Sequence, residues 1–360
     1  PLYFLYKIIS TINMCEHLSM QFPNENFVPV YWMATEDHDF DEINYFNFKN
    51  NKVQWNRVDG GAVGHFDTDG LQEVFEQFSK ELGTTRNAIY LKNLFEEGYL
   101  NNETLTDATR YIANQLFSEF GLVIVDGDDK ELKRLYTPIV AEELTEQTSF
   151  KAVSKTITAL EENYKIQVNP RGINQFYLSE NSRERIVLEN GVYKVNNTDI
   201  TFTKEEILRH LDEVPERFSP NVIMRPLYQE LILPNLAYIG GGGELAYWLE
   251  LKAYFETVNI PFPILLLRNS VQVVSEKQQK KLDNLSISHE ELFLKQHQLL
   301  SKKVVENSVI EVDFNEKIEY LKKQFLELKK IAKKTDVSFV GAVNAQETKQ
   351  IKGLQNLEKR

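Results

Sequence analysis

The hydrophobic positions change period several times along the chain, and each period predicts a different kind of element. Apolar residues recur at helical spacing over residues 2–20, and a short apolar run follows at 28–34. Similar runs occur at 122–126, 235–239 and 262–267, with helical patterns between them. Short buried runs that alternate with helices are typical of a mainly parallel sheet. We therefore expect these four runs to be strands of one sheet, with any other strands outside it.

Two stretches interrupt this α/β pattern. Residues 59–120 contain three helical patterns, and residues 163–198 contain short alternating segments separated by turn residues, which predict a small antiparallel sheet. The fold class expected is thus an α/β core with two inserts. The core is assigned to residues 1–58, 121–162 and 199–274.

Residues 275–360 have a third pattern, with apolar positions at alternating steps of four and three. The seam positions are Phe314, Ile318, Leu321, Phe325, Leu328 and Ala332, then Val340, Val343, Glu347, Gln350, Leu354 and Leu357. Two such helices joined by a short turn predict an antiparallel coiled-coil hairpin whose seam closes on itself; the alternative is a seam that closes against a partner.

Composition narrows the class of protein. The net charge of −12 argues against a nucleic-acid binder, because phosphate contacts need a basic surface. The single cysteine, Cys15, excludes an intrachain disulfide framework and favours a reducing cytoplasm. We find no apolar run of transmembrane length and no signal peptide, so we expect a cytoplasmic protein without membrane contact.

A dense group of ionisable residues follows the first apolar run. Its members are Glu36, Asp37, His38, Asp39, Asp41 and Glu42. Like charges packed this closely repel one another and cost desolvation when buried. Open α/β sheets bind ligands beyond the carboxyl ends of their strands, where this group is expected. It is therefore a candidate catalytic site, and the alternative is a solvated acidic turn that caps the next helix.

A glycine-rich turn follows the run at 235–239. Gly240, Gly241, Gly242 and Gly243 precede Glu244, which begins an amphipathic helix. Such glycines let a phosphate or carboxylate approach the positive end of a helix dipole. Arg225, Tyr228 and Gln229 add a cation and hydrogen-bonding groups upstream; the alternatives are a plain tight turn and a surface salt bridge. Residues 59–65 are also glycine-rich but lack a P-loop ending, so they are a weak phosphate signal.

Both candidate sites follow runs that we expect in one sheet, so we expect them to form one pocket. A histidine titrates near neutral pH, which suits His38 to a general base, while Asp37 or Asp39 suits an ammonium group. His38 serving only as a hydrogen-bonding residue of the turn is the alternative. Gly242→Val is expected to block backbone approach and to disfavour a positive φ.

Five stretches in collinear order carry a family pattern. They are VPVYWMATEDHDFDEIN, GLVIVDGDDKELKRLYTPI, VNPRGINQFYL, NVIMRPLYQELILPNLAYIGGGGELAYWLELK and FVGAVNAQETKQIKGLQNLEKR. Together they resemble the bacillithiol synthase family, the cysteine ligases of bacillithiol biosynthesis. The resemblance implies a Rossmann-like nucleotidyltransferase core akin to class I aminoacyl-tRNA synthetases, with two inserts, a coiled-coil hairpin and a homodimer. It further implies a chain truncated at both ends.

The reaction implied by the resemblance joins cysteine to glucosaminyl malate and makes the low-molecular-weight thiol bacillithiol. Amide formation needs an activated carboxylate, so we expect ATP, with or without Mg²⁺, and no tightly bound metal. Catalytic roles are expected for His38, Asp37 and Asp39. Substrate or nucleotide binding is expected for Gly240, Gly241, Gly242, Gly243, Glu244, Arg225, Tyr228 and Gln229, and for Arg171 and Asn174 in the third stretch.

Three other interpretations stay open. The cluster from Glu36 to Asp39 contains carboxylate and imidazole groups that metal-dependent hydrolases use as ligands. A non-catalytic scaffold could recruit partners through the coiled coil alone. A tRNA-binding synthetase is disfavoured by the acidic core.

Overall fold

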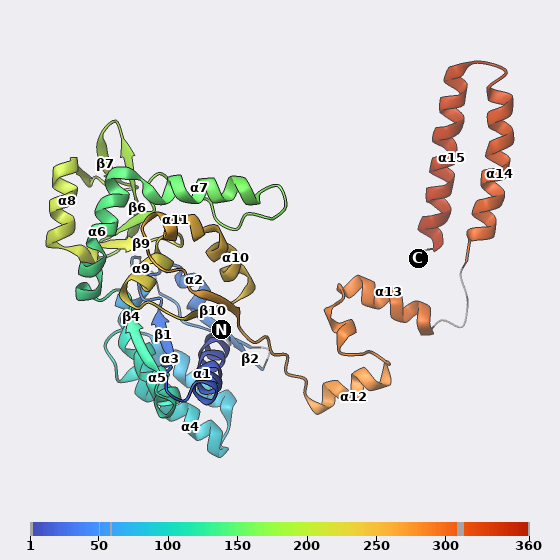
Figure 1. Ribbon diagram of the computed structural model, residues 1–360. Coiled ribbons are helices and arrows are strands. Elements are labelled where there is room, and N and C mark those ends of the chain that lie inside the picture. The colour runs from blue at the N-terminus through green and yellow to red at the C-terminus, as the bar shows by residue number, and fades with distance from the viewer. Residues whose placement is uncertain (1–2, 50, 58–59, 308–312, 359–360) are drawn as a thin grey trace. The chain divides into compact units, whose positions relative to one another are not determined.

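The structure is a computed structural model that describes residues 3–49, 51–57, 60–307 and 313–358 (Figure 1). It divides into two compact units, Pro1–Ser270 and Val271–Arg360. The first unit contains all of the strands that the structure describes, and the second is helical.

The parallel strands lie in two separate pairs. β1 (Val30–Met33) pairs in parallel with β4 (Val123–Asp126), so that Met33 lies opposite Asp126. β10 (Ala237–Gly240) pairs in parallel with β11 (Ile264–Leu267). The prediction of one sheet containing all four strands is therefore wrong. The two pairs are linked through side chains instead of backbone hydrogen bonds, since Trp32 and Tyr238 pack on the same apolar cluster.

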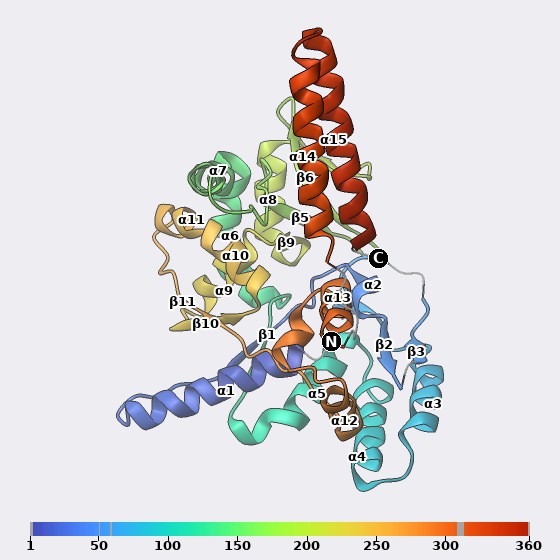
Figure 2. The same cartoon turned by 90° about the vertical axis from the view of Figure 1, so that its right-hand side faces the viewer.

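The first helix, α1 (Tyr3–Gln21), contacts both pairs of strands (Figure 2). Its buried face contains Ile8 and Ile12, which pack with Phe117 and Leu122 near the start of β4. On the side of the other pair, the Ser10 hydroxyl accepts a hydrogen bond of 3.2 Å from the backbone N–H of Asn269. This helix therefore packs against both of the strand pairs that carry the candidate sites.

The region between β1 and β4 is mainly helical and contains a short hairpin. Its elements are α2 (Phe40–Ile43), β2 (Tyr45–Phe48), β3 (Asn51–Gln54), η1 (Val63–His65), α3 (Leu71–Leu82), α4 (Arg86–Phe95), η2 (Glu96–Leu100), α5 (Leu105–Phe117) and η3 (Ser118–Phe120). Phe95 stacks with Phe75 and contacts Phe78 and Tyr99, so the helices close around an aromatic cluster.

The small antiparallel sheet has five strands in the order β8-β7-β6-β5-β9. Their bounds are β5 (Gln175–Leu178), β6 (Arg183–Glu189), β7 (Val192–Val195), β8 (Thr201–Phe202) and β9 (Phe218–Pro220). The sheet lies outside both parallel pairs, as expected, but it continues to Pro220, past the predicted end of the β insert at residue 198. α8 (Lys204–Glu213) and η4 (Pro215–Arg217) connect its last two strands.

The largest apolar core joins this sheet to the remaining helices of the first unit. These helices are α6 (Lys130–Glu146), α7 (Thr148–Leu160), α9 (Arg225–Ile232), α10 (Gly242–Glu250) and α11 (Lys252–Thr257). Fully buried members include Tyr136 of α6, Ile186 of β6 and Trp248 of α10. The sheet is thus packed into the same core that carries the parallel strands.

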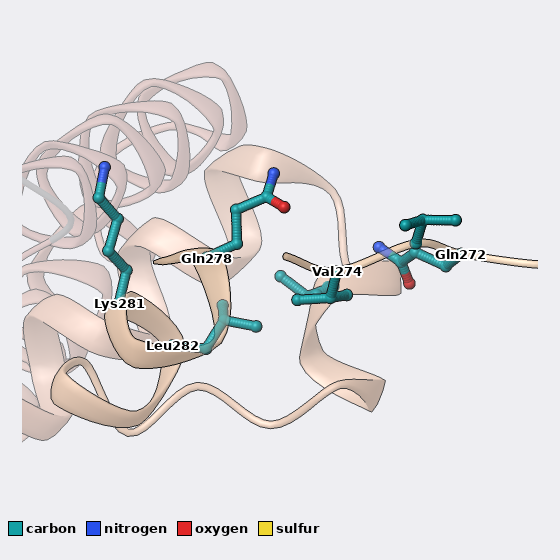
Figure 3. A pocket seen from close by; sticks show the side chains of 7 residues that line it. Gln272, Val274, Gln278, Lys281 and Leu282 are labelled. Atoms are coloured by element: carbon teal, nitrogen blue, oxygen red, sulfur yellow. The ribbon is translucent and has the colours of Figure 1, made fainter. Parts of the chain in front are cut away.

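The second unit begins with α12 (Glu276–Asn284), η5 (Glu290–Phe293) and α13 (Gln296–Asn307). A surface hollow of about 280 Å³ lies beside α12 (Figure 3). Val274 and Leu282 contribute apolar surface to it, and Gln272, Gln278 and Lys281 contribute polar groups. None of the candidate site residues lines this hollow.

The last two helices, α14 (Asn315–Ala332) and α15 (Val337–Glu358), form the predicted antiparallel hairpin. Ile318, Phe325 and Ala332 are buried in its seam with Val343. Leu328 is 47% exposed, so its seam assignment is wrong; Lys329 lies nearer the seam and pairs with Glu347. A heptad pattern assumes 3.5 residues per turn, whereas a straight α-helix has 3.6. Positions that the pattern assigns to the seam therefore shift gradually around the helix, away from the partner helix.

The same difference in period changes which residues of α15 lie in the last part of the seam. Gln350 and Leu357 were expected in the seam, but both are exposed, and Ile351 and Glu358 are partly buried in their place. Glu358 Oε1 accepts a hydrogen bond of 2.9 Å from the backbone N–H of Phe314, which closes the open end of the hairpin.

In the part of the chain that the structure describes, no helix is both long enough and apolar enough to cross a bilayer.

Phe325→Asp tests the hairpin seam. The change removes a buried aromatic ring and buries a charge, so it is expected to destabilise the hairpin by about 3 kcal/mol or more. Leu328→Asp is the matched control and is expected to have little effect. Thermal melting followed by circular dichroism, with limited proteolysis, would show early loss of the hairpin in the first variant and an intact first unit in both. Equal effects of the two variants would contradict the observed seam.

Candidate functional site

The acidic group lies at the shared carboxyl edge of β1 and β4. Because these strands are parallel and in register, the loop after Met33 and the loop after Asp126 lie side by side. The Thr35 hydroxyl donates a hydrogen bond to Asp126 across the two loops. Two acidic turns therefore meet at one edge, where the sequence analysis had considered only the first.

A buried lysine from α6 holds the two turns together. The side chain of Lys133 is 1% exposed, and its Nζ lies 3.1 Å from Glu36 Oε2 and forms an ion pair with Asp128. The same Nζ donates a hydrogen bond of 3.1 Å to the backbone oxygen of Glu216. Burial would lower the pKa of Lys133, but Glu36 and Asp128 together raise it, so the ammonium form is retained.

The two carboxylates respond differently to this environment. Burial raises the pKa of Glu36, and the charge of Lys133 offsets this only in part. Burial would also raise the pKa of Asp128, but hydrogen bonding from His65 and the charge of Lys133 lower it. Asp128 is therefore the ionised member of the pair, and Glu36 takes up a proton more readily.

His65 closes the outer side of the network. Its Nε2 hydrogen-bonds Asp128 Oδ2, and this bond raises the pKa of His65. His65 follows the glycine-rich stretch considered above as a weak phosphate signal. Gly64 there donates a backbone hydrogen bond of 2.9 Å to Thr35, and a Cβ at Gly64 would lie 2.7 Å from Cβ of Thr35. This glycine allows two backbones to approach closely.

Arg183 brings the small antiparallel sheet to the acidic turn. Its Nη1 lies 3.0 Å from His38 Nδ1 and 3.9 Å from Asp37 Oδ1, and its side chain is only 9% exposed. The side chains of Asp37 and Asp39 are 52% and 58% exposed. The predicted catalytic residues are thus accessible, and a buried cation that the sequence analysis missed lies behind them.

Tyr228 and Gln229 are buried, which corrects their expected role in direct binding. Tyr228 is 0% exposed, and its hydroxyl donates a hydrogen bond of 2.9 Å to the backbone oxygen of Gly127. Its ring packs against Trp32 and Tyr136. Tyr228 therefore supports the second acidic turn from beneath and does not face a ligand.

Asn174 is also an interior residue, so its expected contact with substrate does not fit the structure. It is 1% exposed, and its side chain bonds to Ser149 and Asn221, while its backbone N–H donates to Glu143. Arg171 beside it is exposed, and its backbone N–H donates a hydrogen bond of 3.0 Å to Asn174 Oδ1. These contacts fasten the antiparallel sheet to the turn between α6 and α7.

The glycine turn after β10 has its own set of charges. Glu244 Oε2 accepts a hydrogen bond of 2.7 Å from the backbone N–H of Gly241, and its Oε1 lies 2.6 Å from Lys7 Nζ. Arg225 and Arg268 are close enough to Lys7 to lower its pKa, although burial is the larger cause. Glu244 is thus paired with Lys7, and Arg225 and Arg268 are near enough to add positive charge, which favours a further anion.

Gly242 and Gly243 are the accessible part of this turn. A Cβ at either position would meet no atom within 4 Å, and neither residue has a positive φ. The expectation that Gly242 needs a positive φ is therefore wrong, because it is the first residue of α10. The expectation that its backbone is open to a ligand stays a prediction.

The two candidate sites are built on different strand pairs, so the expectation that one sheet edge carries both is wrong. They nevertheless influence a common residue, Tyr3 of α1. Burial raises the pKa of Tyr3, and the next causes come from both sites, Glu42 on one side and Glu244 with Arg268 on the other. A shared pocket stays a prediction.

The acidic residues do not form a metal-binding arrangement. Within the described ranges, no group of three or more His, Cys, Asp or Glu side chains is placed to hold a metal ion. Glu36 is directed to Lys133, and His38 is directed to Arg183. The four residues from Glu36 to Asp39 thus do not converge as the hydrolase interpretation requires.

The fold and the strand-edge sites define a Rossmann-like protein with a helical coiled-coil extension, and comparisons with known proteins agree. Residues 1–269 match the family model for the N-terminal Rossmann-like domain of BshC, "Bacillithiol biosynthesis BshC". Residues 271–360 match the model for the BshC C-terminal coiled-coil domain. The chain belongs to the BshC family, which confirms the resemblance found in the sequence.

Curated relatives align with the whole chain and carry the name "Putative cysteine ligase BshC". Those of Flavobacterium johnsoniae and Flavobacterium psychrophilum are each 58% identical over 360 residues. The relative from Christiangramia forsetii is 56% identical over 365 residues. In each case the alignment covers 100% of this chain and 68% of the relative.

Lys133→Met tests whether the buried ammonium holds the two acidic turns. Removing it leaves Glu36 and Asp128 without their cation, and losing one partner of a buried ion pair costs about 3–5 kcal/mol. Because burial already raises the pKa of Glu36, the loss should be largest near pH 7 and smaller near pH 5, where a larger fraction of Glu36 is protonated. Urea unfolding at both pH values measures this difference.

Lys130→Met is the matched control on the same helix. Lys130 is 45% exposed and pairs with Glu216 at the surface, so its loss should cost at most about 1 kcal/mol at either pH. A Lys133 variant as stable as this control would show that the acidic turns do not depend on the ammonium.

Proposed function

We propose that this chain forms part of a ligase that joins cysteine to glucosaminyl malate and yields bacillithiol, with ATP as the source of activation. The core is of the class I aminoacyl-tRNA synthetase type with two inserts, and the protein acts in the cytoplasm as a homodimer. The observation that carries the proposal is family membership combined with an open acidic edge at the end of β1.

The acidic edge suits the amino acid. Cysteine carries an α-ammonium group, and Asp37 and Asp39 offer exposed carboxylates at a strand end where ligands commonly bind. Glu36 and Asp128 are paired with Lys133, so they hold the turns in place, and the carboxylates of Asp37 and Asp39 remain exposed to a substrate.

The glycine turn suits an anionic partner. Lys7, Arg225 and Arg268 exceed the single charge of Glu244, and the backbone of Gly242 and Gly243 is open at the start of α10. The residues present therefore fit phosphate groups of ATP or the carboxylates of the malate moiety. When bound, ATP supplies the activation that a carboxylate needs before an amine can displace its oxygen.

His38 is the candidate for direct contact with the reacting groups. It lies between the exposed carboxylates Asp37 and Asp39, and its Nε2 is directed away from Arg183. As a proton acceptor or as a hydrogen-bond donor, the imidazole would act on the amide being formed. Either role makes the ring necessary for turnover.

The test of the proposed function is product formation by the full-length protein. It would be incubated with cysteine, glucosaminyl malate and ATP, and bacillithiol would be detected by thiol labelling and mass spectrometry. Omission of ATP is the control for the activating nucleotide. Absence of bacillithiol with all three substrates present would refute the proposal, and equal product without ATP would refute the role of ATP.

Gly242→Val tests the anion site. The new side chain meets open space in the protein, so folding should be unaffected, but it covers the backbone that a phosphate or carboxylate would approach. The KM for ATP or for glucosaminyl malate is expected to rise by about tenfold or more. Gly341→Val, which also meets open space but lies in the hairpin, is the control. Unchanged KM values for both substrates would remove the glycine turn from the site.

His38→Ala tests the catalytic edge. Loss of the imidazole is expected to lower kcat by about a hundredfold, with little change in the KM for cysteine. His17→Ala on α1 is the control, since His17 belongs to neither candidate site. Full turnover by the His38 variant would exclude a catalytic role for this residue.

A further inference from the structure

Arg183 is held in place from three sides, independently of His38. Its Nε donates a hydrogen bond of 3.0 Å to Ser219 Oγ, and its Nη2 donates one of 2.8 Å to the backbone oxygen of Pro220. Its Cζ lies 4.2 Å from the centre of the Phe176 ring. The guanidinium thus extends from β6 across β5 to β9, with little freedom to move.

This rigid group imposes a hydrogen-bonding state on His38. A guanidinium has only donors, and Arg183 Nη1 lies 3.0 Å from His38 Nδ1. Nδ1 must therefore accept, which in a neutral imidazole leaves the proton on Nε2. Rotating the ring by half a turn would place a C–H group against the guanidinium and forfeit the bond.

The other charged groups around the imidazole do not favour the opposite tautomer. Asp37 Oδ1 lies 3.5 Å from Nδ1, but it already accepts a hydrogen bond of 2.7 Å from the backbone N–H of His38. Asp39 Oδ1 lies 3.9 Å from Nε2, on the side where a protonated nitrogen is favoured. Phe176, whose ring centre is 5.7 Å from that of His38, adds no charge.

We propose that Arg183 is a positioning residue that fixes His38 in the tautomer with its proton on Nε2. His38 then acts as a hydrogen-bond donor to an oxygen of the acyl group under attack, and not as the base that removes a proton from the amine. A nitrogen that already carries a proton cannot accept another. A fixed donor directed at the oxygen where negative charge develops stabilises the transition state.

The tautomer can be observed directly in this chain by NMR, whether or not the proposed function holds. The chain has six histidines, so ¹⁵N-histidine labelling gives few imidazole signals, and the signal lost in His38→Gln identifies His38. In the neutral form of the wild-type imidazole, the signal is expected to show the proton on Nε2. A neutral form with the proton on Nδ1 would overturn the proposal.

Substitutions in β6 test whether Arg183 determines the tautomer of His38. Arg183→Met should let His38 populate both tautomers, whereas Arg185→Met, two residues along the strand at an exposed position, should leave the wild-type signal unchanged. Arg183→Lys keeps a cation and serves if the Met variant does not fold; it should also relax the preference, because one ammonium cannot hold all three anchors. An unchanged His38 signal in a folded Arg183 variant would overturn the role of Arg183.

The catalytic half of the inference rests on the proposed function and is tested in the full-length enzyme. A glutamine amide can donate a hydrogen bond near the position of Nε2 but cannot accept a proton. His38→Gln is therefore expected to keep kcat at least about tenfold above that of His38→Ala. Equal losses in the two variants would overturn the donor role. Absence of bacillithiol from the wild-type enzyme would refute the proposed function and the donor role together, while the NMR result on the tautomer would stand.

Discussion

The candidate active edge depends on one buried ammonium group. Lys133 forms ion pairs with Glu36 from the first acidic turn and Asp128 from the second. It also donates a hydrogen bond to the backbone oxygen of Glu216, which follows α8. Without that charge, two carboxylates at neighbouring strand ends would repel each other in a desolvated site. The accessible carboxylates of Asp37 and Asp39 are therefore positioned by residues that a substrate does not touch.

Charges of opposite sign are separated across the first unit in a way that matches a ligase with dissimilar substrates. Exposed carboxylates follow β1, and an excess of cations surrounds the turn after β10. α1 contributes Lys7 to the second set and contacts both strand pairs. Such an arrangement favours a zwitterionic amino acid on one side and a multiply charged anion on the other, the combination that the proposed reaction requires.

The sequence was sufficient to predict local secondary structure, but it did not predict contacts between residues that are distant along the chain. The four parallel strands and the hairpin helices were predicted because each depends on its own periodicity, and the open glycines were found from their spacing. Sheet membership failed because the period of a strand does not specify its neighbour. Lys133 and Arg183 were missed for a related reason: each is a site residue only because other strands approach it, and Arg183 lies 145 positions from His38. The acidic residues that follow both of the apolar runs at 28–34 and 122–126 were the one available signal in the sequence.

The ion pair between Lys329 and Glu347 determines how the hairpin can move. Coiled coils can slide by whole heptads when every seam position is apolar, because the displaced side chains find equivalent partners. Here the seam contains a partly buried charge on each helix, and a slide would separate the two and leave each facing apolar neighbours. The ion pair thus favours the register of the hairpin over one that is shifted by a heptad.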